Sequence, residues 1–139
     1  MSTINQRLEE LRDTFNSLDN WEEKYQQIIY SGKKLATLPD ELKTEENLVP
    51  GCVSKVWIFA SNKNGRLEIL ADSEATITKG LVAILVQIFQ LQKPEDILRF
   101  DFNELSNLGI SEHLTMNRRN GLASMIEIIK GWAEKSKSN

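Results

Sequence analysis

The sequence predicts an α+β fold in which a small antiparallel sheet of three short strands is packed by helices. Three segments with strand character, 47–50, 54–60 and 66–72, follow one another with only turns between them. Strands that are neighbours in sequence favour antiparallel pairing. The first segment ends in a proline, which suits an edge strand. Apolar residues recur at helical spacing before and after this region, so helices are expected on both sides of it along the chain.

Two amphipathic helices are expected ahead of the strands. The apolar stripe of the first consists of Ile4, Leu8, Leu11, Phe15 and Leu18. Asn20 is placed to cap the second helix, with Glu23 at the third helical position reaching back to the helix start. The apolar face of the second consists of Trp21, Tyr25, Ile28, Ile29 and Leu35. Both helices should pack on the core, and the polar segment 38–47 should form a loop or a short helical turn.

The strand region contains one strong turn signal, the dipeptide Asn64-Gly65. Asn-Gly between two strand-like runs favours a two-residue hairpin. A two-residue turn at this position pairs Phe59 with Leu70 and Trp57 with Asp72. The sequence therefore predicts both a hairpin and its register.

A buried helix is predicted from about Thr76. One of its faces consists of Ile77, Leu81, Ile84, Leu85, Ile88 and Leu91. The opposite side is apolar too, through Val82, Val86 and Phe89. A helix that is apolar nearly all round is a buried helix. We expect it to be the core against which the sheet packs, and to end at Pro94.

The remaining chain is expected to be mostly helical. A short helical turn is predicted over 94–100, and a short helix or loop over 101–110. Thr115 is placed to cap a long final helix that reaches about Lys135. Its inward-facing residues are Leu122, Met125, Ile126, Ile129 and Ala133.

Composition excludes several classes of function. Twenty acidic against seventeen basic residues give a net charge of −3, which argues against nucleic acid as the main partner. The amphipathic N-terminus does not resemble a signal peptide, and the apolar run 80–91 is too short to span a bilayer. With one cysteine and one histidine, a structural zinc site is not expected. We expect a reducing, cytoplasmic location and no membrane association.

The single cysteine, Cys52, lies between the turn-forming pair Pro50-Gly51 and the second strand-like segment. A lone cysteine often only packs in the core. Here the neighbouring glycine lets another molecule approach or the loop flex, and reactive groups tend to lie on loops of a rigid scaffold. Lys55 is close in sequence, and a lysine near a thiol favours the thiolate. Cys52 is therefore the candidate nucleophile.

The main alternative is a Cys–His enzyme, a hydrolase or thiol peroxidase. His113 is the only histidine, so it would have to be the base that activates Cys52. The other reading of His113 is a polar residue near a helix start. Arg118 and Arg119 open the final helix, the end where the helix dipole disfavours positive charge, which indicates an anion or an acidic partner. As solvated surface residues, the two arginines would need no partner.

Several blocks of the sequence together resemble the SufE/CsdE family. They are NWEEKYQQII (20–29), GCVSKVW (51–57), ADSEATITKGL (71–81), PEDILRFD (94–101) and HLTMNRRNGL (113–122). The blocks occur in the family's order and cover most of the chain. Two positions depart from the family pattern: Ala71 stands where glycine is frequent, and Met116 where proline is common.

The resemblance implies a single SufE-like domain over residues 1–139 with an IscU-like arrangement of helices on a small sheet. It also implies a sulfur acceptor that activates a pyridoxal-phosphate-dependent cysteine desulfurase of the SufS/CsdA kind. The acceptor would take persulfide sulfur onto its own cysteine, pass it to a SufBCD-type scaffold for iron–sulfur cluster assembly, and hold no cofactor or metal itself. We expect a monomer or a weak homodimer.

By matching position, the resemblance makes Cys52 the persulfide acceptor, and Asp72, His113 and Arg118 supporting residues near it or on the partner surface. A second thiol would resolve a persulfide to a disulfide, so a solitary cysteine suits a carrier. An IscU-like cluster scaffold would need about three cysteines. We expect Cys52 to rest against apolar neighbours such as Val53 or Trp57, which would raise its pKa, and to swing out to its partner.

Overall fold

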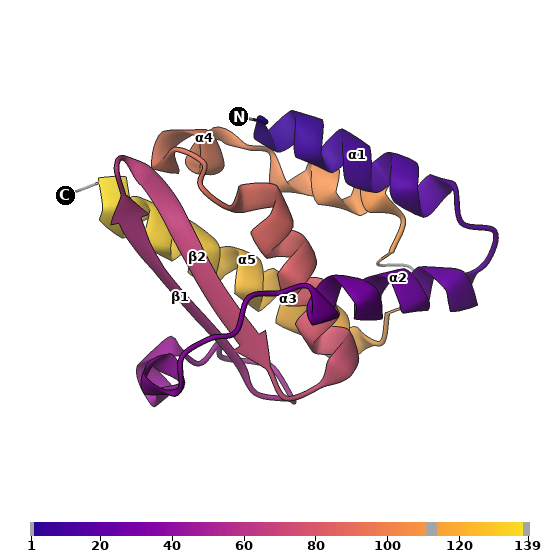
Figure 1. Ribbon diagram of the computed structural model, residues 1–139, viewed down its shortest axis with the longest axis horizontal. Coiled ribbons are helices and arrows are strands. Elements are labelled where there is room, and N and C mark those ends of the chain that lie inside the picture. Colours follow the sequence, from indigo (N-terminus) through magenta and orange to yellow (C-terminus); the bar gives the residue numbers. More distant parts are fainter. Residues whose placement is uncertain (1, 111–113, 138–139) are drawn as a thin grey trace.

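The computed structural model describes residues 2–110 and 114–137, and its architecture is α+β, as predicted. A single hairpin lies at one side of the molecule, and α3 runs through the middle, in contact with the hairpin and with other helices (Figure 1). The elements in chain order are α1 (Ile4–Asn16), α2 (Trp21–Lys33), η1 (Asp40–Leu42), η2 (Glu45–Asn47), β1 (Val56–Lys63), β2 (Arg66–Ser73), α3 (Thr76–Phe89), α4 (Pro94–Arg99), η3 (Phe102–Leu108) and α5 (Met116–Lys137), where η marks a 3₁₀ helix.

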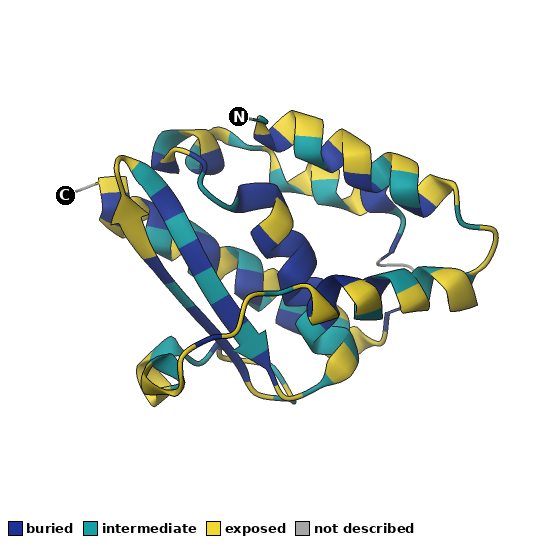
Figure 2. Ribbon diagram, in the orientation of Figure 1, coloured by how far each residue is buried: buried dark blue, intermediate teal, exposed yellow. Residues whose placement is uncertain are grey.

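The hairpin has the predicted register. Strands β1 and β2 are antiparallel, with Trp57 opposite Asp72 and Phe59 opposite Leu70. Asn64 and Gly65 both have positive φ, 54° and 85°, as a tight two-residue turn with a right-handed strand twist requires. Buried and half-buried residues alternate along β2 (Figure 2), so one face of the hairpin packs inward.

The prediction of a third strand over 47–50 is wrong, because the sheet described has two strands. Segment 47–50 makes only one isolated bridge, between Leu48 and Trp57, with the Val49 N–H donating to the Val56 carbonyl at 2.8 Å. Pro50 has no N–H with which to extend a ladder. Gly51 then turns the chain through a left-handed conformation, φ 81°.

The outer edge of β2 is covered by the residues that follow α3. The Gln90 side chain pairs with the backbone of Ile69, accepting from its N–H at 2.7 Å and donating to its carbonyl at 2.8 Å. Next to it, the Leu67 N–H donates to the Gln92 carbonyl at 2.9 Å. Because Gln90 and Gln92 pair with β2 and do not continue the helix, α3 ends at Phe89, before the predicted end at Pro94. Protected edges of this kind prevent strand-to-strand association.

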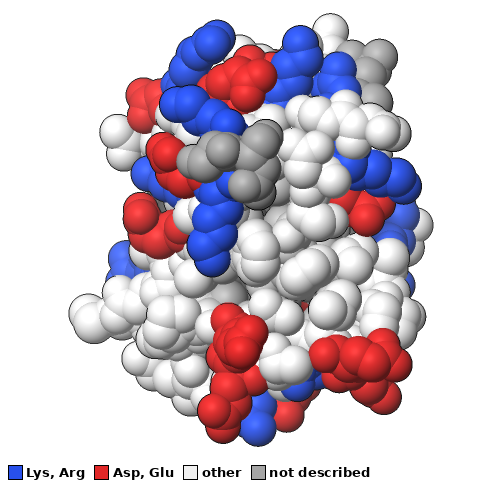
Figure 3. Space-filling model, turned by 90° about the vertical axis from the view of Figure 1, so that its left-hand side faces the viewer, with Lys and Arg blue, Asp and Glu red and all other residues white. Residues whose placement is uncertain are grey.

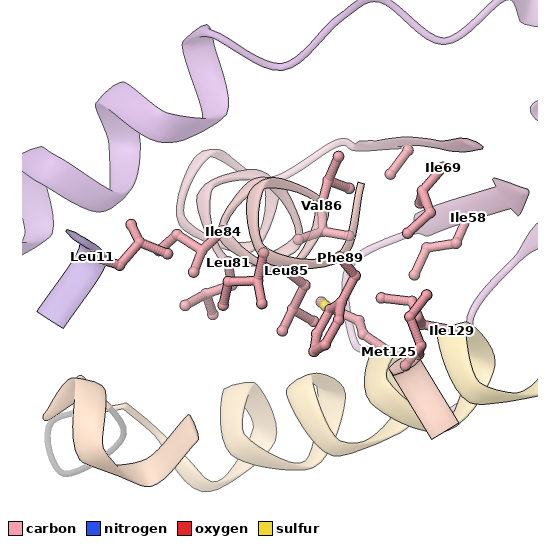
Figure 4. Close-up of a cluster of buried hydrophobic side chains, with 14 of the residues drawn as sticks. Leu11, Ile58, Ile69, Leu81, Ile84, Leu85, Val86, Phe89, Met125 and Ile129 are labelled. Atoms are coloured by element: carbon pink, nitrogen blue, oxygen red, sulfur yellow. The ribbon is translucent and has the colours of Figure 1, made fainter. Parts of the chain in front are cut away.

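Helix α3 is the centre of the core, as its sequence predicts. It packs against α1, α2, α5 and β2, and apolar side chains extend from it on several sides (Figure 4). Leu81, Ile84 and Phe89 are almost completely buried. From α5, Met125 and Ile129 close the cluster on the side away from α1 and α2.

The capping predictions for the second and last helices are confirmed. The Asn20 side chain accepts from the Glu23 N–H at 2.9 Å. Glu23 reaches back one residue further than expected, to the N–H of Asp19 at 2.8 Å. The Thr115 hydroxyl accepts from the Arg118 N–H at 3.3 Å, and α5 continues to Lys137.

Charge is unevenly distributed over the face that carries the short 3₁₀ turns. Acidic side chains gather at its lower end, where η1 and η2 lie in Figure 1, and most of the basic ones lie toward its upper end (Figure 3). Glu41 in η1 and Glu45 and Glu46 in η2 are exposed. The centre of the face is uncharged.

Candidate functional site

Cys52 lies in the loop between the Pro50-Gly51 turn and β1, and its side chain rests against α5. The residue is half-buried. Its Sγ is 3.8 Å from the carbonyl oxygen of Gly121, in the geometry of a weak S–H···O hydrogen bond. Burial raises the pKa of the Cys52 thiol, because removing a group from water disfavours its charged form. The resting thiol is thus kept protonated.

The thiol forms part of the wall of a cavity of about 420 Å³. Three segments that are distant in sequence make the rest of the wall: the loop after Cys52, the start of α3, and the first turns of α5. The lining residues with polar side chains are Ser54, Thr76, Thr78, Thr115, Asn117 and Arg118. Val53, Ile77, Leu81 and Met125 supply apolar surface. The cavity combines an apolar floor with hydroxyl, amide and guanidinium groups around one nucleophile.

The expected shielding of the thiol exists, and Val53 contributes to the cavity wall although it is mostly exposed. Trp57, the other residue expected to shield the thiol, does not line the cavity. The Val53 side chain is 80% exposed, and its neighbour Lys55 is exposed and does not line the cavity. Further shelter comes from α5, where Gly121 lies against the sulfur. Consecutive residues of this irregular segment differ in exposure, so proximity in sequence did not identify the shielding group.

Asp72 lies near the end of β2 and is held by two lysines. Its carboxylate oxygens are 3.1 Å from Nζ of Lys43 and 3.2 Å from Nζ of Lys79, and the Ser73 N–H donates to it at 2.8 Å. Burial acts to raise the pKa of Asp72, but these hydrogen bonds and charges outweigh it and hold the pKa below its usual value. Lys43 also lies over the Trp57 ring, 5.8 Å from its centroid.

The structure therefore brings together two of the four predicted site residues. Cys52 and Arg118 line the same cavity. Asp72 is not part of that wall and instead links η1, through Lys43, to α3, through Lys79. His113 lies outside the described residues, so its predicted role stays a prediction.

Three contributors to the site were not anticipated: Gly121, which contacts the thiol, and the lysines that hold Asp72. Gly121 lies in one of the sequence blocks that resemble the family, so its position could have been marked as a candidate. The sequence does not show that this glycine faces Cys52. Lys43 lies in the polar segment that separates α2 from β1 and pairs with a carboxylate far along the chain.

The described residues contain no group of three or more His, Cys, Asp or Glu side chains placed to hold a metal ion. Within the same part of the chain, no helix combines the length and apolar character needed to cross a membrane.

Comparison with known proteins decides the family. The family model "SufE: Fe-S metabolism associated domain" matches residues 9–133. The chain belongs to the SufE family. Its SufE domain includes Cys52 and the whole cavity wall, and membership links the protein to Fe–S metabolism.

Relatives and folds agree with this membership. The chain is 39% identical over 132 residues to an uncharacterized SufE-like protein of Rhizobium meliloti (strain 1021), in a match that covers 91% of this chain and 94% of the relative. The solution structure of a hypothetical protein from Thermus thermophilus superimposes with a TM-score of 0.81, covering 96% of this chain and 97% of that one. At 19% identity, that likeness shows that the two chains share a fold.

Proposed function

We propose that this SufE protein accepts persulfide sulfur on Cys52 from a cysteine desulfurase, activates that enzyme, and passes the sulfur to iron–sulfur cluster assembly. The observation that carries the proposal is the single thiol of the chain, half-buried on a loop at the edge of a cavity. Family membership supports the link to Fe–S metabolism. A location in the cytoplasm and a SufBCD-type scaffold as the next acceptor belong to the same proposal.

The transfer needs one nucleophile and no redox partner. The Cys52 thiolate attacks the terminal sulfur of the desulfurase persulfide, and the bond between the two donor sulfurs breaks. The desulfurase cysteine leaves as a thiolate, and Cys52 then carries the transferred sulfur as a persulfide. This is the displacement reaction of thiol–disulfide exchange. A chain with a single cysteine cannot discharge the product by closing an internal disulfide.

Burial of the resting thiol supports a two-position mechanism. With its pKa raised by burial, Cys52 is mostly protonated near neutral pH and reacts slowly with small electrophiles. Movement of the loop out of the cavity would rehydrate the thiol and bring it to the partner's persulfide. The exposed turn at Pro50 and Gly51 provides a hinge for that movement, since glycine tolerates a wide range of backbone angles.

The supporting residues fit distinct roles in this proposal. Arg118, in the cavity wall with Cys52, is placed to favour an anionic sulfur. Asp72 would act at a distance, by fixing η1 and the start of α3 beside the loop. His113 would contribute at the partner surface. The alternative of a Cys–His hydrolase or peroxidase is not favoured by family membership.

Activation of a desulfurase tests the proposal. Alanine production from L-cysteine by a SufS/CsdA-type enzyme should rise when the wild-type protein is added and should not rise with Cys52→Ser. Wild-type protein that binds the desulfurase without accelerating it would contradict the proposal. Turnover of esters or peroxides by the protein alone, lost in the same variant, would instead support the Cys–His enzyme.

A further inference from the structure

Helix α5 leaves a gap in its surface where the thiol of Cys52 rests. Gly121 is buried, and a Cβ built on it would lie 3.2 Å from Sγ of Cys52. That separation is shorter than an ordinary carbon–sulfur contact, so any side chain at position 121 would press on the sulfur. The absence of a side chain is what allows the thiol to lie against the helix.

Gly121 differs in this respect from the other glycine of the same helix. A Cβ built on Gly131 would meet nothing within 4 Å, and the residue is exposed. Glycine is a poor helix former in both places. At position 121 the lower helix stability that glycine causes is accompanied by a contact with the Cys52 thiol. At position 131 there is no such contact.

The loop touches the same face of α5 at a second point. Gly51 has φ 81°, and a Cβ built on it would lie 3.1 Å from Oγ of Ser124. Gly121 and Ser124 are three residues apart and so lie on one side of the helix. The pair Gly51-Cys52 is thus seated on α5 through two close approaches, each of which depends on a missing side chain.

We propose that Gly121 is a positioning residue that holds the thiol of Cys52 in its sheltered position and sets how readily the thiol leaves it. The functional part of this inference rests on the proposed role of Cys52 in sulfur transfer. The geometric part does not, because it concerns the resting thiol alone. A methyl group at position 121 would separate the thiol from the Gly121 carbonyl and displace the loop tip toward solvent.

The test compares Gly121→Ala with Gly131→Ala, two identical changes in one helix. The rate of Cys52 alkylation by iodoacetamide is measured across pH, without any desulfurase. Gly121→Ala should react about three- to tenfold faster than wild type at pH 7, with the midpoint of its pH profile moved toward that of an exposed thiol. Gly131→Ala should follow the wild-type profile. An unchanged or slower rate in Gly121→Ala would overturn the proposal.

A thermodynamic cycle provides a second readout. The Cβ of Cys52 lies 4.0 Å from the position of a Cβ on Gly121, so alanine at 52 leaves room for the new methyl. In a Cys52→Ala background, Gly121→Ala should stabilise the protein as Gly131→Ala does, since alanine favours the helix. With Cys52 present, Gly121→Ala should stabilise the protein less. The effects of substitutions at 52 and 121 on stability should therefore be coupled, whereas those at 52 and 131 should be additive. Equal gains in both backgrounds would contradict the proposed contact.

The positioning role and the sulfur-transfer function fail in different ways. If alkylation responds as expected but no desulfurase places sulfur on Cys52, the sulfur-transfer function fails and the positioning role of Gly121 stands. If wild-type protein receives sulfur but both glycine variants alkylate at the wild-type rate, the positioning role fails alone.

Discussion

Gly80 of α3 lies directly against the backbone of Ile28 in α2, so closely that a Cβ built on Gly80 would overlap the Ile28 carbonyl oxygen. From the other side of the crossing, a Cβ on Gly32 would lie 2.9 Å from the backbone nitrogen of Gly80. The two helices therefore touch backbone to backbone. This contact fixes the start of α3, which supplies one wall of the thiol cavity.

Gly80→Ala should lower the free energy of unfolding by about 3 kcal/mol, because neither backbone can move away without disturbing the core. Urea denaturation measures the change. Gly131→Ala, in open space, is the control and should be neutral or slightly stabilising. Equal stability of the two variants would show that the α2–α3 crossing is looser than described.

Asp72→Asn should destabilise the protein at neutral pH by on the order of 1 kcal/mol, because it removes the charge that holds Lys43 and Lys79. The folded-state pKa of Asp72 is depressed, so its stabilising effect is complete above the unfolded value of about 4 and is lost as pH falls through the folded value. Urea unfolding of both proteins from pH 7 downward should therefore show the difference shrinking below about pH 4. A difference that is the same at every pH would exclude the ionised carboxylate as its source.

Cys52 should react with iodoacetamide more slowly than a small exposed thiol at pH 7, because burial raises its pKa and only the thiolate attacks. The midpoint of the pH–rate profile should lie above that of the same protein unfolded in urea. Because the folded-state pKa is the higher one, unfolding becomes more favourable as pH rises from the unfolded value to the folded value. Identical profiles in the folded and unfolded protein would remove the evidence for a sheltered thiol.

Arg118→Ala should slow the loading of sulfur from a desulfurase by about tenfold, since a cation in the cavity wall favours the anionic sulfur. Arg119→Ala is the matched control, because Arg119 is the adjacent residue, is exposed and does not line the cavity. Loading is measured as sulfur bound per chain over time. The unfolding free energy of both variants should stay within about 0.5 kcal/mol of wild type. Equal loading by the two variants would argue against a role for Arg118 at the thiol.

Local patterns in the sequence were sufficient to predict the hairpin and most of the helices. Asn64-Gly65 set the register that pairs Trp57 with Asp72, because a two-residue turn leaves one alignment. The third strand was wrongly predicted, since the β-forming character of Leu48 and Val49 is overridden by the turn that follows. The early end of α3 depends on the pairing of Gln90 with Ile69, a tertiary contact that no local pattern contains.

The site was only partly predictable for the same reason. Cys52 could be singled out from its setting, whereas Arg118 was distinguished from Arg119 only by its match to a block of the SufE/CsdE family. The contact between Cys52 and Gly121 joins residues far apart in sequence, and it depends on the angle at which α5 meets the loop. Glycine also leaves no periodic signal, because it contributes no side chain to a face.

Mass spectrometry can detect directly whether Cys52 receives sulfur. The protein is incubated with a cysteine desulfurase and L-cysteine, its intact mass is measured, and the modified peptide is mapped. We expect a gain of one sulfur atom on Cys52, absent from Cys52→Ser and absent without L-cysteine. If the protein stays unmodified while a desulfurase that binds it turns over L-cysteine, Cys52 is not a sulfur acceptor.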